Sequence, residues 1–155
     1  MNALDLDRLR RCLELAREAR AGGNQPFGSL LVDRDGETLI ELMNTAGTGD
    51  VTGHPELALA SWASVNLSAD DRGAATLYTS CESCAMCATA QYWAGVGRLV
   101  FALSGEQLDA IAPTDAPRLA LSSREVFSRG NRPITVEGPC DELYAEAIAV
   151  FDGFW

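Results

Sequence analysis

The chain has 155 residues, a length typical of one domain that buries about 68–70% of its unfolded surface. Its 12 Lys and Arg residues are outnumbered by 22 Asp and Glu residues, so the net charge is −10. Because Lys and Arg supply the affinity for polyanions, this balance disfavours nucleic acids and anionic membranes as partners. No apolar run approaches the roughly 20 residues of a membrane span, so we expect no membrane association.

The cysteines indicate the redox compartment. Three of the five lie within seven residues, at positions 81, 84 and 87. An odd number with such crowding is typical of thiolate chemistry rather than of a disulfide framework. The N-terminus is charged and has no apolar signal core. We therefore expect a cytoplasmic protein.

Helical and strand patterns alternate along the chain and predict a single domain over residues 1–155. Apolar residues at helical spacing, stopped by Gly22-Gly23, predict a first helix over 4–21. Strands are predicted at 27–33, 37–43, 75–79, 98–103 and 133–137, and further helices at about 55–65, 84–94, 119–127 and 141–151. This order predicts an α/β fold, a three-layer α-β-α sandwich with a five-stranded mixed sheet. A helical crossover before the last strand would make it parallel to the fourth.

Two helix starts carry potential zinc ligands. Pro55 is tolerated only in the first turn of a helix, so His54 should stand at the start of the 55–65 helix. Ser83 is the expected N-cap of the next helix, which would place Cys84 in its first turn and Cys87 on the same face. One imidazole and two thiolates are three ligands for Zn²⁺, with the fourth position left for water.

Glu56 lies in the same first turn as His54. Zinc lowers the pKa of water to about 7, and a carboxylate beside it can accept the proton and pass it onward. Attack of hydroxide on an electron-poor C–NH₂ carbon then expels ammonia. The residues therefore predict a hydrolytic deaminase with Glu56 as its proton carrier.

The pattern H-x-E followed by C-x-x-C resembles the zinc-dependent cytidine/nucleobase deaminase superfamily. Within it, LYTSCE…C..C…YWA is similar to the small guanine deaminase branch. The resemblance implies a cytidine deaminase-like fold, zinc on His54, Cys84 and Cys87, and proton transfer by Glu56. Two positions depart from the family pattern, which has proline at Ser83 and a small residue at Pro55.

The same resemblance implies contacts with the substrate. Asn44 would hydrogen-bond the base and Phe27 would help to wall the pocket. Asp115 falls where the branch carries an acid that binds a ring amino group. The branch exchanges its C-terminal segment between protomers, which implies a homodimer in which residues 141–155 are swapped and Trp155 closes the partner's site.

Four functions stay open. The first is deamination of a free base, either guanine or a related aminated purine, pyrimidine or triazine ring. The second is editing of a tRNA adenosine, which the acidic balance disfavours. A third is a non-catalytic, zinc-stapled interaction module, in which Cys81 would be the fourth ligand. The last is a dithiol redox pair formed by Cys84 and Cys87.

Overall fold

The computed structural model describes residues 1–115 and 117–155. Five strands form one sheet in the order β2-β1-β3-β4-β5. Strand β1 is antiparallel to β2 and β3, whereas β3, β4 and β5 are parallel. The strands are β1 (Gly28–Val32), β2 (Thr38–Met43), β3 (Thr76–Cys81), β4 (Arg98–Leu103) and β5 (Thr135–Glu137). The predicted five-stranded mixed sheet is confirmed, and so is the parallel pairing of the last two strands.

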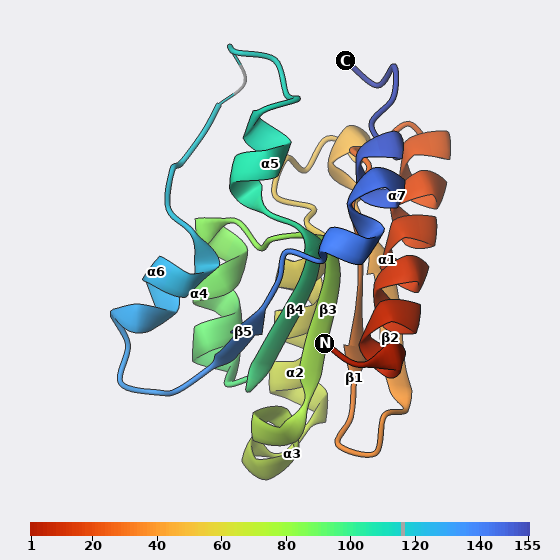
Figure 1. Cartoon of the computed structure of the whole chain (residues 1–155). Coiled ribbons are helices and arrows are strands. Elements are labelled where there is room, and N and C mark those ends of the chain that lie inside the picture. Colours follow the sequence, from red (N-terminus) through yellow and green to blue (C-terminus); the bar gives the residue numbers. More distant parts are fainter. Residues whose placement is uncertain (116) are drawn as a thin grey trace.

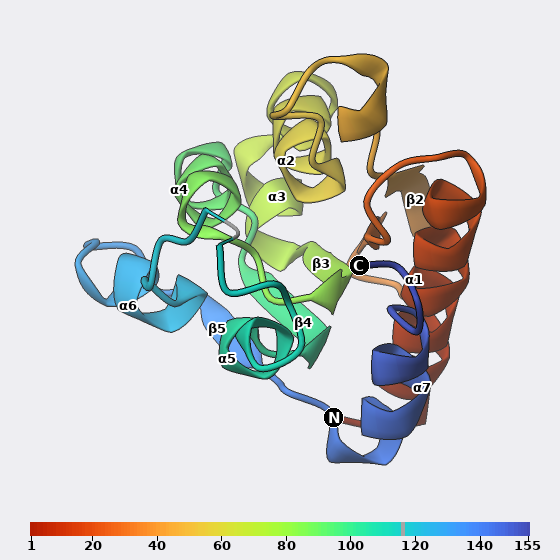
Figure 2. The same cartoon turned by 90° about the horizontal axis from the view of Figure 1, so that it is seen from above.

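Helices cover both faces of the sheet (Figures 1 and 2). Helices α1 and α7 pack on one face and α2 and α4 on the other, with α6 beside α4. The helical elements are α1 (Ala3–Ala21), η1 (Ala46–Thr48), α2 (Pro55–Asn66), α3 (Ala69–Ala74), α4 (Ala85–Ala94), α5 (Gly105–Asp109), α6 (Ser123–Ser128), η2 (Asp141–Leu143) and α7 (Tyr144–Ala149). The three-layer prediction is therefore confirmed.

Alternating side chains of the strands divide the core in two. In β4, Val100 and Ala102 face α1 and α7, whereas Leu99 and Phe101 face α2 and α4. This is the two-residue period of a strand that is buried on both sides. The centre of the sheet is therefore buried on both sides.

Several predicted boundaries were wrong. Helices α3 and α5 were not predicted; they are short and begin directly after the N-cap residues Ser68 and Ser104, whose side chains accept hydrogen bonds from first-turn N–H groups. The helix predicted over 119–127 begins later, behind the cap Ser122. The helix predicted over 141–151 is a 3-10 turn, η2, followed by the six residues of α7.

The buried face of α2 was also wrongly predicted. Within the predicted 55–65 helix, the helical spacing of Leu57, Ala58, Ser61 and Val65 predicts that these residues face the core. In the structure Val65 is 81% exposed, and the buried residues are Pro55, Glu56, Leu59, Ala60 and Ala63. Small apolar residues surround most of this helix, so its pattern does not distinguish one face from another. The docking of its first turn against the end of the sheet selects the face.

Candidate zinc and catalytic site

His54 is the N-cap residue of α2, as predicted, with Pro55 in the first turn. Its backbone is extended and its side chain makes no capping hydrogen bond. The imidazole is therefore free to point away from the helix toward α4. It is half-buried.

Cys84, not Ser83, is the N-cap residue of α4, which begins at Ala85. The prediction that Ser83 caps the helix was wrong by one residue. Serine is common at the N-cap because its hydroxyl oxygen accepts a hydrogen bond from a first-turn N–H group. Here, however, the Ser83 side chain is buried and its Oγ has no partner among the described residues. Cys84 is exposed at the helix start and Cys87 is buried in the first turn.

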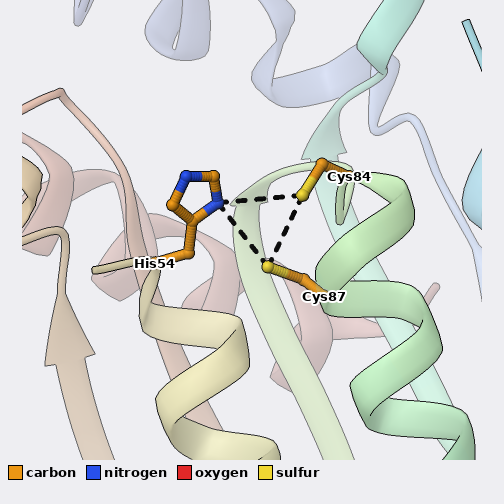
Figure 3. Close-up of side chains that lie close together, drawn as sticks. All are labelled: His54, Cys84 and Cys87. Carbon is orange, nitrogen blue, oxygen red and sulfur yellow. Dashed lines mark hydrogen bonds between the residues drawn. The ribbon is translucent and has the colours of Figure 1, made fainter. Parts of the chain in front are cut away.

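The three side chains point toward one another from the starts of α2 and α4 (Figure 3). His54 Nδ1 lies 3.7 Å from Cys84 Sγ and 3.6 Å from Cys87 Sγ, and the two sulfur atoms are 3.6 Å apart. Ligand atoms of a tetrahedral zinc, with Zn–S of about 2.3 Å and Zn–N of about 2.0–2.1 Å, lie about 3.5–3.8 Å from one another. The three atoms therefore fit one tetrahedral zinc ion and leave its fourth corner for a non-protein ligand.

Cys81 does not belong to this group in the described part of the chain. It is the last residue of β3, and its buried Sγ faces the Ser104 carbonyl oxygen at 3.9 Å. Burial raises the pKa of Cys81 above its usual range. A buried, protonated thiol at the end of a strand is not placed to complete a four-ligand site.

The contacts of Cys84 with Cys87 and His54 favour the thiolate form of Cys84. Its hydrogen bonds with Cys87 and His54 outweigh burial and lower the pKa of Cys84 to about 4. The contact with Cys84 also raises the pKa of His54. A thiolate next to an imidazole is a set of ligands that binds a divalent metal ion.

Glu56 lies behind this group and is 5% exposed. Thr79 Oγ1 donates a hydrogen bond of 2.6 Å to Glu56 Oε1, and Ser29 Oγ lies 2.9 Å from Thr79 Oγ1. No Lys or Arg pairs with Glu56 among the described residues. Burial raises the pKa of Glu56, partly opposed by the Thr79 hydrogen bond. A buried carboxyl group without a cationic partner holds a proton more readily than an exposed one, and this property suits a group that accepts and delivers protons.

A cavity of about 640 Å³ joins these residues, within the roughly 300–1,000 Å³ of small-molecule sites. His54, Glu56 and Cys84 line one part, together with Asn44 and Phe27. Asn44 is fully buried, its Oδ1 accepts from the Ala46 N–H at 2.9 Å, and its Nδ2 has no partner within the described ranges. That amide group is a donor available to a ligand.

Asp115 and Trp155 lie outside the cavity lining. Asp115 is exposed. Trp155 is 52% exposed and stacks on Phe151 with ring centroids 5.4 Å apart, and Phe151 in turn contacts Phe27 at 5.7 Å. The tail thus contacts the cavity lining at Phe27, and a direct substrate contact by either residue stays a prediction.

No sequence motif identifies the residues on one side of the cavity. Its lining residues are Ser104, Gly105, Glu106, Leu108, Asp109, Pro117, Arg118, Leu119, Ala120, Leu121, Ser122 and Glu125, with Glu82 beneath them. These residues carry no spacing motif, so their proximity to Cys84 is visible only in the tertiary structure. Across residues 1–115 and 117–155, no helix has the length and hydrophobicity needed to span a membrane.

Comparisons with known proteins agree with this geometry. Residues 4–103 match the family model of the cytidine and deoxycytidylate deaminase zinc-binding region. A probable cytosine deaminase of Schizosaccharomyces pombe is 36% identical over 153 residues, 97% of this chain and 92% of the relative. A guanine deaminase of Bacillus subtilis is 41% identical over 88 residues, 56% of each chain, and tRNA-specific adenosine deaminases are also relatives. A solved structure of guanine deaminase from Nitrosomonas europaea has a TM-score of 0.65 at 25% identity, over 95% of this chain and 82% of its own.

Proposed function

The chain belongs to the cytidine and deoxycytidylate deaminase zinc-binding family, and on that premise we propose that it deaminates a free nucleobase by hydrolysis. The substrate class is guanine or a related aminated purine, pyrimidine or triazine ring. The observation that carries the proposal is the burial of Glu56 on the wall of the cavity that also contains the His54 and Cys84 side chains. We infer that its carboxyl group would meet both the base and the water in this cavity.

The roles follow from the side chains. His54, Cys84 and Cys87 would hold zinc, which when bound would supply a hydroxide nucleophile at neutral pH because it lowers the pKa of water to about 7. Glu56 takes the proton from water and delivers it to the amino group. The C–O bond forms, the C–N bond breaks and ammonia leaves, while the ring carbon becomes a carbonyl and the second proton of the water ends on the adjacent ring nitrogen. Thr79 orients Glu56 through its 2.6 Å hydrogen bond.

The charge of the cavity favours an uncharged base over a phosphorylated substrate. Arg118 is the only Arg or Lys in the described lining, against the acids Glu56, Glu82, Glu106, Asp109 and Glu125. Like charges repel phosphate groups and so lower the affinity for nucleotides and tRNA. Asn44 Nδ2 offers a donor to a ring nitrogen or carbonyl, and Phe27 offers an apolar wall.

A screen for ammonia release tests this function. Zinc-loaded protein is incubated with guanine, cytosine, adenine, an aminotriazine, the corresponding nucleosides and nucleotides, and tRNA. We expect turnover of one or more free bases, little for nucleotides, and loss of all turnover after chelation. Release from tRNA, with salt-sensitive tRNA binding in a gel shift, would support the tRNA function that some relatives have. Zinc binding with no turnover of any compound would favour an interaction module instead.

Compartment and assembly are part of the same proposal. All five cysteines are free thiols, which supports a reducing compartment such as the cytoplasm. Exposed Trp93 and Val65, on the adjacent helices α4 and α2, support a homodimer that covers them. Light scattering of the purified protein measures the assembly, and mixed dimers of wild type and a Trp155 deletion test whether the tail is exchanged.

A further inference from the structure

One side of the cavity is formed by a segment that arrives after β4. We call its described residues 104–109 and 117–122 the α5–α6 wall. The wall carries cavity-lining side chains, but helix α5 has only five residues, which is too short to be stable in isolation. The position of the wall relative to His54 and Cys84 must therefore be set by contacts with the rest of the molecule.

The Glu82 side chain makes those contacts at both ends of the wall. Its Oε2 accepts a hydrogen bond of 3.2 Å from the Gly105 N–H, at the start of α5. Its Oε1 accepts bonds of 3.0 Å from the Ser123 N–H and 2.6 Å from Ser123 Oγ, at the start of α6. The Glu82 N–H also donates to the Leu103 carbonyl at 2.8 Å. Glu82 thus links the first turn of α5 to the first turn of α6, at the two ends of the wall.

These hydrogen bonds of Glu82 with Gly105 and Ser123 can hold the wall in place, and we call them the Glu82 clamp. First-turn N–H groups have no partner within their own helix, and a carboxylate is the strongest ordinary acceptor for them. No Arg or Lys forms an ion pair with Glu82 in the part of the chain described. Its two oxygens are therefore committed to the wall. Glu82 is also two residues before Cys84, so the clamp is tied to the zinc ligands by the chain itself.

We propose that Glu82 is a positioning residue that fixes the α5–α6 wall against the zinc site and so sets the affinity for the base. The second half of this inference rests on the proposed function. Glu82 itself touches neither the reacting carbon nor zinc. Its removal should loosen one wall of the cavity while the His54, Cys84 and Cys87 group stays intact.

Hydrogen exchange tests the clamp without any substrate. In zinc-loaded Glu82→Gln, we expect the Gly105 and Ser123 amides to exchange about tenfold faster or more, the equivalent of about 1.4 kcal/mol for the lost charged acceptor. Zinc content should stay at the wild-type value. Glu142→Gln is the matched control, because Glu142 is exposed on η2 and its side chain makes no hydrogen bond or ion pair with the described residues. Unchanged exchange at both amides, or loss of zinc, would overturn the clamp.

Kinetics with the best base from the screen test the consequence. We expect Glu82→Gln to raise KM about tenfold and to change kcat much less, with Glu82→Ala larger in the same direction. Ser123→Ala removes only the hydroxyl donor and should raise KM less. In the double variant with Glu82→Gln the effects should not add, because both changes break one network.

The outcomes separate the two ideas. A wild-type KM in Glu82→Gln, despite faster exchange, would show that the wall does not bind the base and would overturn the positioning role alone. If wild-type protein turns over no base at all, the proposed function fails, and the binding half of this inference fails with it. The exchange result then still decides whether Glu82 holds the wall.

Discussion

Two buried carboxylates, Asp5 and Glu56, depend on neighbouring residues of β3 that point to opposite faces of the sheet. On the α1 face, Asp5 accepts hydrogen bonds from Tyr78 Oη at 2.7 Å and from Arg98 Nη1 at 2.9 Å. On the α2 face, Glu56 accepts one bond from Thr79, at 2.6 Å. Both acids are almost fully buried. They therefore differ in their partners rather than in their burial.

The difference appears in their proton affinities. Burial raises the pKa of Asp5, but hydrogen bonds from Arg98, Asn2 and Tyr78 outweigh it and lower that pKa to about 2. Burial raises the pKa of Glu56 and the single bond from Thr79 does not compensate. A buried acid that is paired with a cation holds the fold together, whereas one without a cation is poised to move protons. The first should matter for stability and the second for activity.

The largest expected effect is on activity. Glu56→Gln keeps the shape of the side chain but cannot accept and deliver a proton, so we expect kcat/KM to fall by about 10³-fold. Zinc content should be unchanged, and the midpoint of thermal unfolding should be equal or higher because no uncompensated carboxyl group is buried. Metal analysis, ammonia release and a thermal melt measure the three quantities. Retained turnover would exclude Glu56 as the proton carrier.

Zinc removal should affect stability next most strongly. Zinc that binds only the folded state stabilises it by about 4 kcal/mol when its concentration is 1,000 times the dissociation constant. We expect chelation to lower the unfolding midpoint by about 10 °C. The Cys87→Ser variant should have a low unfolding midpoint before chelation, and the chelator should change that midpoint little. A midpoint that is insensitive to chelation in wild type would contradict a zinc site at this position.

On the other face, Asp5→Asn should destabilise without changing the chemistry. A pKa lowered from 3.8 to about 2 corresponds to about 2 kcal/mol at pH 7. Urea unfolding should show that loss, while kcat/KM stays at the wild-type value. A fall in kcat/KM larger than the change in folded fraction would break the separation between the two acids.

The smallest expected effect is the pH dependence of the stability that Asp5→Asn loses. Because the folded-state pKa of Asp5 is depressed to about 2, its contribution is complete above the unfolded value near 4 and disappears as the pH falls toward 2. The gap between wild type and Asp5→Asn should shrink by about 1 kcal/mol between pH 5 and pH 3. Both proteins are compared after chelation, so that zinc release cannot contribute. A constant gap would show that the ion pair is not its source.

The sequence by itself determined the layers, the parallel pairing of β4 with β5 and the group that fits zinc. These features depend on local signals, namely strand and helix periods, the Pro55 that marks a helix start, and the spacing of Cys84 and Cys87. Local signals act within a few residues, so they are readable without the fold.

Only the tertiary structure decided how those pieces meet. The α2 face followed from docking, since its small apolar residues gave no preference. Cys84 rather than Ser83 is the N-cap of α4, because the path of the chain after β3 sets the residue at which the helix begins. The hydrogen bonds of Asp5 with Arg98, of Glu56 with Thr79, and of Glu82 with Gly105 and Ser123 join residues 23 to 93 positions apart. No local pattern encodes such contacts, because they exist only once the sheet has brought the segments together.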